Sequence, residues 1–151
     1  MKTTVLSLTM SVVVLLLFSF APSKANEELF TLTIKVDGFR TSTGVAQYSI
    51  YNKDGTIPDE HFERYYLQKT GEITKNHSVL TFINIPRGRY AVNILHDENE
   101  NGKIDKGWVM PIEGIGFSNY SSIGLTNRPK FSKASFDVNS NMTITVKIIY
   151  L

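Results

Sequence analysis

Residues 79–95, VLTFINIPRGRYAVNIL, decide the fold class of this chain. Both ends of the stretch, residues 79–85 and 89–95, are rich in the β-branched, aromatic and aliphatic residues that favour strands, and each has the length of a strand. Pro86 and Gly88 lie between them in a Pro-Arg-Gly sequence that signals a turn. The stretch therefore predicts two β-strands separated by a tight turn.

The strand pattern continues on both sides of this stretch. Residues 29–36, LFTLTIKV, alternate apolar and polar side chains, which places one face of a strand in a core. Residues 44–51, GVAQYSIY, form a second run, and a turn signal, Asn-Lys-Asp-Gly, follows it. Residues 134–138 and 142–149 are two more strands around an Asn-Ser-Asn turn. Six strands separated by turns predict an all-β fold: an antiparallel β-sandwich of the Ig-like or prealbumin-like kind, with about seven strands.

Two stretches depart from the strand pattern. Residues 59–68, DEHFERYYLQ, place Phe62, Tyr65 and Tyr66 at helical spacing and predict one short helix. Because aromatic side chains most often fill cores, these three are expected to cover an edge of the sandwich. Residues 106–131 form a long irregular loop with four glycines. A loop of this length in a compact domain is usually functional or loosely ordered.

Three aromatic residues of the 106–131 loop leave two interpretations open. Trp108, Phe117 and Tyr120 either pack onto the sandwich, as aromatic side chains usually do, or line a pocket beside it. The second interpretation makes the protein a carrier of a small apolar ligand.

The candidate metal site is DENENGKID, residues 97–105. Oxygen-bearing side chains stand at its first, third, fifth and ninth places, and a glycine at the sixth place allows a sharp turn, as in calcium-binding loops. The backbone carbonyl of the seventh residue supplies a further ligand in such loops. The sequence thus predicts a calcium site with ligands from Asp97, Asn99, Asn101, Lys103 and Asp105.

This loop lacks one ligand. A complete loop carries a bidentate carboxylate at the twelfth place, and here that place is Trp108. Glu113 or a water molecule is the candidate replacement. Such a site should be weak, with a dissociation constant of roughly 10⁻⁴–10⁻³ M, as in extracellular modules. The alternative is a metal-free polar turn, because Asn101-Gly102 is a hairpin signal and Asp or Asn side chains also cap turns.

The first 25 residues have the composition of a secretory signal peptide. Lys2 gives a positive start, residues 5–20 are mostly apolar, and Ser23 and Ala25 place small residues where a signal peptidase reads them. The apolar run is shorter than the roughly 20 residues of a spanning helix, and no cysteine follows it for lipid attachment. We expect cleavage after Ala25, a periplasmic or secreted protein, and no membrane span in the mature chain.

The mature chain, residues 26–151, has the size of one domain. Removing Lys2 and Lys24 from the 16 basic residues leaves 14, which equals the 14 acidic residues. This balance argues against nucleic acid as a partner, since nucleic acids attract basic patches. The sequence has no cysteine, so a hydrophobic core must hold an exported domain together without disulfides. We expect a single β-sandwich domain with an envelope or extracellular partner.

A longer pattern resembles a known family. The run GRYAVNILHDENENGKIDKG, followed by PIEGIGFSN and PKFSKASFDV, is similar to a bacterial secreted family catalogued as a domain of unknown function (number 2141). The resemblance implies a small exported β-sandwich with no assigned activity. The sequence IPRGRYAV also resembles the strand entry of transthyretin-like and carboxypeptidase-regulatory-like sandwiches, and such a likeness carries no function by itself.

Common catalytic signatures are missing from the sequence. It has no cysteine nucleophile, no Gly-x-Ser-x-Gly elbow and no HExxH zinc signature. His96 beside Asp97 offers an acid–base pair or a zinc ligand, but strand alternation points the two side chains to opposite faces. We therefore expect a non-catalytic binding or structural module. A metal-dependent hydrolase built on His96, Asp97 and Glu113 is the remaining alternative.

Overall fold

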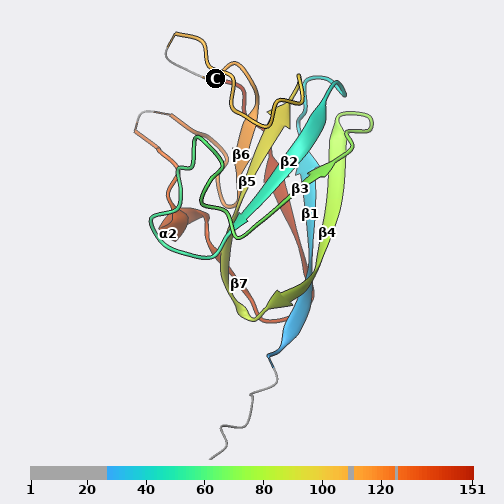
Figure 1. Ribbon diagram of the computed structural model, residues 1–151, viewed down its shortest axis with the longest axis vertical. Coiled ribbons are helices and arrows are strands. Elements are labelled where there is room, and N and C mark those ends of the chain that lie inside the picture. Colours follow the sequence, from blue (N-terminus) through green and yellow to red (C-terminus); the bar gives the residue numbers. More distant parts are fainter. Residues whose placement is uncertain (1–26, 109–110, 125) are drawn as a thin grey trace, which may run out of the picture.

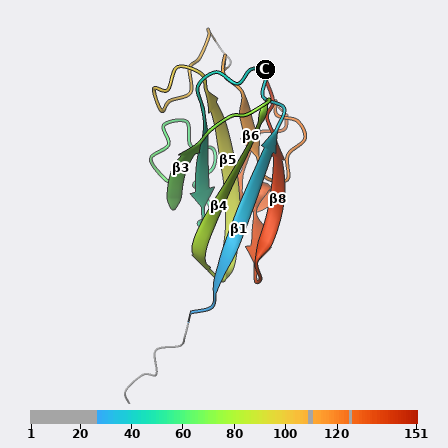
Figure 2. The same ribbon diagram turned by 90° about the vertical axis from the view of Figure 1, so that its right-hand side faces the viewer.

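Two β-sheets pack face to face in the computed structural model, which describes residues 27–108, 111–124 and 126–151 (Figure 1, Figure 2). The expected β-sandwich is therefore confirmed. The expected signal peptide and its cleavage site after Ala25 lie outside the described residues.

The smaller sheet has the strand order β4–β1–β8 (Figure 2). β1 (Leu29–Asp37) lies in its middle, antiparallel to β4 (His77–Pro86) and parallel to β8 (Met142–Lys147). The β1–β8 pair is thus an exception to the expected antiparallel arrangement. The alternation read from the sequence fits this place, because the apolar side chains on the inner face of β1 have no exposed surface (Leu32, Ile34 and Val36).

The larger sheet has the strand order β3–β2–β5–β6, and β7 pairs with the start of β5. Every pair in it is antiparallel. β5 pairs with three of the other strands, which explains why residues 90–97 are all buried. The strands are β2 (Val45–Tyr51), β3 (Leu67–Gly71), β5 (Gly88–Asp97), β6 (Ile115–Phe117) and β7 (Phe136–Val138).

The turn predicted between residues 85 and 89 joins the two sheets. β4 before it belongs to the smaller sheet and β5 after it to the larger one. The Tyr90 hydroxyl donates to the carbonyl of Pro86 at 2.8 Å and holds the turn closed. A turn signal between two strands therefore did not mean that the strands pair with each other.

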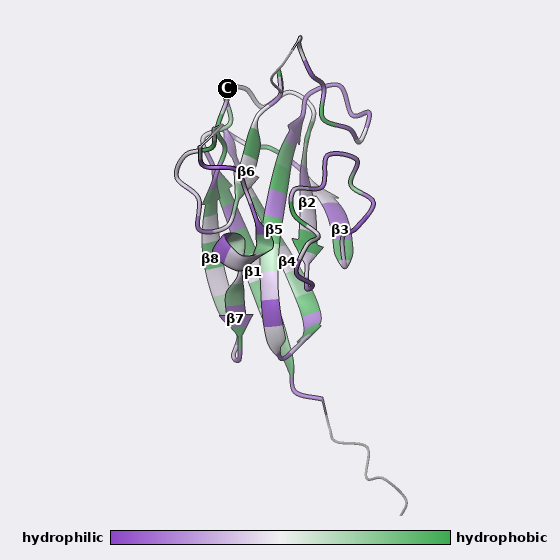
Figure 3. Ribbon diagram, turned by 90° about the vertical axis from the view of Figure 1, so that its left-hand side faces the viewer, coloured by the Kyte–Doolittle hydropathy of each residue, from purple (hydrophilic) through white to green (hydrophobic). Residues whose placement is uncertain are grey.

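The main hydrophobic core fills the space between the sheets. The longer strands contribute alternate residues to it, so apolar and polar bands follow one another along these strands (Figure 3). The largest fully buried side chains of this core come from both sheets: Tyr48, Ile50 and Ile94 from the larger, Leu32, Ile34 and Phe82 from the smaller.

A second hydrophobic cluster covers the other face of the larger sheet. The chain around residues 52–66, together with residues 118–124 and 131–134, lies on this face as an extra layer (Figure 1). Ser118 fastens that layer, since its hydroxyl accepts the N–H of Val92 at 2.9 Å and donates to the carbonyl of Ala134 at 2.7 Å. The buried members are Tyr51, Ile57, Phe62, Ala91, Leu95, Ile115, Phe117, Tyr120, Phe131 and Ala134.

The short helix predicted for residues 59–68 is absent, and this prediction was wrong. The segment forms turns that lead into β3. The Asp59 carboxylate accepts the backbone N–H of Arg64 at 2.8 Å, and the N–H of Tyr66 donates to the carbonyl of Ile50 at 2.6 Å. Pairing with β2 therefore overrides the helical spacing of the aromatic residues.

Eight strands lie in the described part of the chain, against about seven expected. The sequence did not reveal the short edge strands β3 and β6. Ala134, expected to begin a strand, instead ends the single helical turn α2 (Phe131–Ala134).

Candidate functional site

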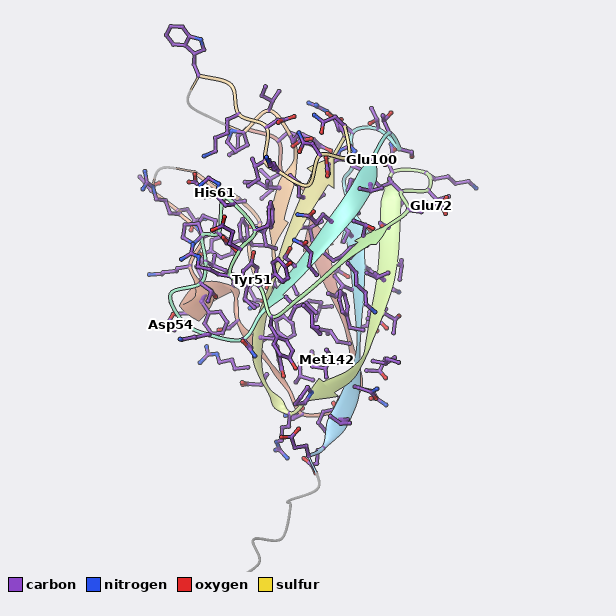
Figure 4. All side chains as sticks on the ribbon, viewed as in Figure 1. Tyr51, Asp54, His61, Glu72, Glu100 and Met142 are labelled. Atoms are coloured by element: carbon purple, nitrogen blue, oxygen red, sulfur yellow. The ribbon has the colours of Figure 1, made fainter. Side chains whose placement is uncertain are left out.

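The acidic loop of residues 97–105 follows directly from β5, at the end of the sandwich near Glu100 (Figure 4). Asp97 is only 2% exposed. One of its carboxylate oxygens accepts the N–H of Asn101 at 3.0 Å, and the other accepts the N–H of Gly102 at 2.7 Å. Asp97 thus closes the loop from its first place.

Two further side chains shape the loop from within. Asn99 Oδ1 accepts the N–H of Asn101 at 3.2 Å, and Asn101 Oδ1 accepts the N–H of Lys103 at 2.8 Å. Gly102 has φ +72°, which a glycine adopts without steric cost. These local turns are the ones that the two-residue spacing of Asp and Asn favours.

The structure brings the candidate side chains Asn99, Asn101 and Asp105 together. Asn99 Nδ2 lies 2.6 Å from one Asp105 oxygen, and Asn101 Nδ2 lies 3.1 Å from the other. The amide nitrogens therefore occupy the positions beside the carboxylate that a cation would take. A half-turn of either amide would point its oxygen at this place, at the cost of the hydrogen bond that the oxygen accepts from the N–H of Asn101 or Lys103.

Glu113, the candidate for the missing ligand, holds both arms of the loop. Its Oε1 accepts the N–H of Glu98 at 2.9 Å and its Oε2 accepts the N–H of Asp105 at 3.0 Å. The side chain is 4% exposed. Burial raises the pKa of this carboxyl group above its ordinary value; the two N–H donors lower it, and the charges of Asp105 and Asp97 raise it further.

The candidate carboxylate ligands Asp97, Asp105 and Glu113 carry negative charge that no neighbouring basic side chain pairs with in the described part of the chain. No group of three or more His, Cys, Asp or Glu side chains is arranged as a metal site in the same part of the chain. Of the candidate carboxylate ligands, Asp97 and Glu113 thus accept backbone N–H groups, whereas Asp105 faces the two asparagine amides.

Arg40 and Glu98 form an ion pair that the sequence analysis did not predict. Arg40 Nε donates to Glu98 Oε1 at 2.9 Å, and the guanidinium lies 4.9 Å from the centre of the Tyr150 ring. Its hydrogen bond to Glu98 lowers the pKa of that carboxyl group. Since 58 residues separate the two side chains, no local pattern announces the contact.

Both ring nitrogens of His96 face groups of the surrounding fold. Its Nδ1 lies 2.7 Å from the Tyr150 hydroxyl and its Nε2 lies 2.9 Å from the carbonyl of Thr43. The ring has no exposed surface and packs edge-on against Phe39. Both nitrogens are occupied away from Asp97 and Glu113, so the three residues of the hydrolase hypothesis do not form one site.

The three aromatic residues of the long loop divide into two groups. Phe117 and Tyr120 are buried in the second hydrophobic cluster, with their ring centres 6.0 Å apart. Trp108 is fully exposed. Phe117 and Tyr120 therefore pack onto the sandwich, as the first interpretation expected, whereas Trp108 does not.

The family of the chain follows from a model match. The family model described as "Uncharacterized protein conserved in bacteria (DUF2141)" matches residues 34–145, so the chain belongs to this family. No curated protein and no solved structure matches the chain. Among the described residues, no helix has the length and apolar character needed to cross a membrane.

Proposed function

We propose that this member of the DUF2141 family is an exported, non-catalytic binding or structural module that binds calcium weakly in its 97–105 loop. The observation that carries the proposal is the loop itself. Oxygen-bearing side chains from its first, third, fifth and ninth places are held in one tight turn by their own hydrogen bonds. Calcium-binding loops draw their ligands from the same places along the chain.

The electrostatics of the loop favour a cation. Asp97 and Glu113 are almost fully buried, and burying a carboxylate is costly unless a charge or strong hydrogen bonds compensate it. The raised pKa of Glu113 indicates that its N–H donors do not compensate the burial fully. A calcium ion between Asp97 and Asp105 would supply the missing positive charge. Asn99 and Asn101 would contact it through their amide oxygens and would give up the hydrogen bonds that these oxygens now accept from the backbone.

Calcium binding would act as folding energy. The unfolded chain lacks the assembled loop, so an ion that binds only the folded form stabilises it. The ion would fix the end of β5 to the chain that leads to β6. A weak site of this kind fills where calcium is plentiful, outside the cytoplasm. Export agrees with the composition of residues 1–25.

Thermal unfolding of the mature chain tests the calcium site. With a dissociation constant of roughly 10⁻⁴–10⁻³ M, about 10 mM calcium should add about 1.4–2.7 kcal/mol to the free energy of unfolding. For a domain of this size, that raises the midpoint relative to EDTA by about 5–10 °C. Magnesium at the same concentration is the control and should have a smaller effect, since it demands a stricter geometry. Equal midpoints in calcium and EDTA would refute the proposed site.

Cell fractionation tests export separately. The full-length chain, expressed in a bacterial host, should appear in the periplasm or medium in a shortened form that begins at Asn26. A full-length product that stays in the cytoplasm would contradict this part of the proposal and leave the calcium site untouched.

A further inference from the structure

A half-open pocket of about 290 Å³ lies on the outer face of the larger sheet, under the long loop. This volume is near the lower end of the roughly 300–1,000 Å³ that small-molecule sites occupy. Its walls are mostly apolar and combine β6 with the loops that cover the sheet. The apolar lining residues include Ile104, Pro111, Ile115, Phe117, Ile123 and Pro129.

One buried polar side chain of the pocket has an oxygen atom without a hydrogen-bond partner. Asn93, on β5, lines the pocket and is 1% exposed, and its Oδ1 accepts no hydrogen bond in the described structure. The ladders to Ser49 on β2 and Phe117 on β6 fix its backbone in the middle of the sheet. A buried acceptor without a donor is unfavourable, whereas an apolar side chain of the same shape would not be. The place of this amide therefore points to a group that the pocket receives.

Three other polar side chains of the pocket are already engaged. The Asp59 carboxylate accepts the Tyr51 hydroxyl at 3.2 Å and the N–H of Arg64 at 2.8 Å. At the rim, Lys106 and Glu60 form an ion pair. Among the described buried polar side chains of the pocket, Asn93 is thus the one with an unpartnered atom, while the exposed Arg128 also lines the pocket. Because an amide both donates and accepts, it suits a neutral head with the same capacity.

We propose that this pocket binds a small neutral amphipathic molecule. Its hydroxyl or carboxamide head hydrogen-bonds to the amide of Asn93, and its apolar body lies against Ile115 and Phe117. Ligand binding in this pocket does not require calcium in the 97–105 loop, although Ile104 of that loop lines the pocket. It gives the exported module a ligand of defined chemistry.

Titrations followed by NMR test the proposal, with benzyl alcohol and benzamide as the probes and toluene as their apolar match. In EDTA, both polar probes should cause saturable shifts of the amide signals of β5 and β6 in the wild-type chain. Asn93→Leu should weaken their binding by about tenfold, the value of one hydrogen bond, and leave toluene binding unchanged. Tyr48→Phe is the matched control: it removes another unpartnered buried polar atom, from the main core, and should bind like the wild type.

Two further measurements keep the test decisive. Without ligand, Asn93→Leu should unfold at the wild-type temperature or above it, because it removes an unpartnered polar group. Ile123→Trp, on the pocket wall, should block all three probes by filling the space. The proposal is overturned if no probe gives saturable shifts in the wild type, if Asn93→Leu binds the polar probes as tightly as the wild type does, or if Ile123→Trp still binds them.

Discussion

Replacing Gly116 by alanine tests how closely β6 packs against the rest of the sandwich. A Cβ atom at this position would lie 2.7 Å from the backbone carbonyl oxygen of Lys147 and 2.9 Å from Val146 Cγ1. Both distances are shorter than carbon atoms tolerate, and the carbonyl belongs to the backbone at the end of β8, which cannot move aside cheaply. The contact exists because β6 and β8 approach closely where the two sheets meet.

The expected cost follows from overpacking. Forcing an extra carbon into a packed site typically costs about 1–3 kcal/mol. Gly116 is not at positive φ, so alanine also gains about 0.4–1 kcal/mol by restricting the unfolded chain. The net effect should be a loss of about 1–2 kcal/mol, or a midpoint lower by about 4–8 °C.

Gly124→Ala is the matched control on the same loop. A Cβ atom at Gly124 meets no atom within 4 Å, so only the gain from the unfolded chain remains. The two glycine variants should therefore shift the stability in opposite directions. Urea unfolding measures both, and amide hydrogen exchange should show faster opening of the β5–β6 ladder in Gly116→Ala alone. Equal stabilities for the two variants would mean that the close β6–β8 packing is wrong.

Three other expectations concern the acidic loop and its surroundings. Asp97→Ala should abolish the midpoint rise in calcium and lower the stability in EDTA by about 2 kcal/mol, because two charge-assisted hydrogen bonds are lost. The control Asp54→Ala, in an exposed turn, should change neither quantity. Thermal scans measure both variants, and a calcium response retained in Asp97→Ala counts against the site. The raised pKa of Glu113 contributes stability that is present below its ordinary value of 4.5 and is lost as the pH rises through the folded pKa. The stability of the wild type relative to Glu113→Gln should therefore fall from about pH 4.5 upward. Urea unfolding across that range checks the sign, and a stability difference that rises with pH refutes it. Tyr150→Phe should cost about 1–2 kcal/mol, because the hydroxyl that serves His96 and a backbone N–H is lost; an unchanged urea midpoint would show that these hydrogen bonds contribute no net stability.

The strands were predictable because alternation is a local property. Residues 29–36 and 44–51 show period two, and β1 and β2 occupy nearly the same bounds. Which strands pair with one another is not a local property of the sequence. The parallel pairing of β1 with β8 and the passage from β4 to β5 between sheets depend on which apolar faces meet. The edge strand β6 is only three residues long and exists because it pairs with β5, so no pattern of its own marks it.

The acidic loop shows the same division at the level of single side chains. The sequence by itself determined the turns made by Asp97, Asn99 and Asn101, because their hydrogen bonds reach only two to five residues along the chain. Only the tertiary structure decided that Glu113 engages the backbone of both arms of the loop and that Asn93 lies buried without a hydrogen-bond partner for its Oδ1. Spacing fixes contacts within a turn, whereas contacts between distant segments form only when burial of the two sheet faces brings those segments together.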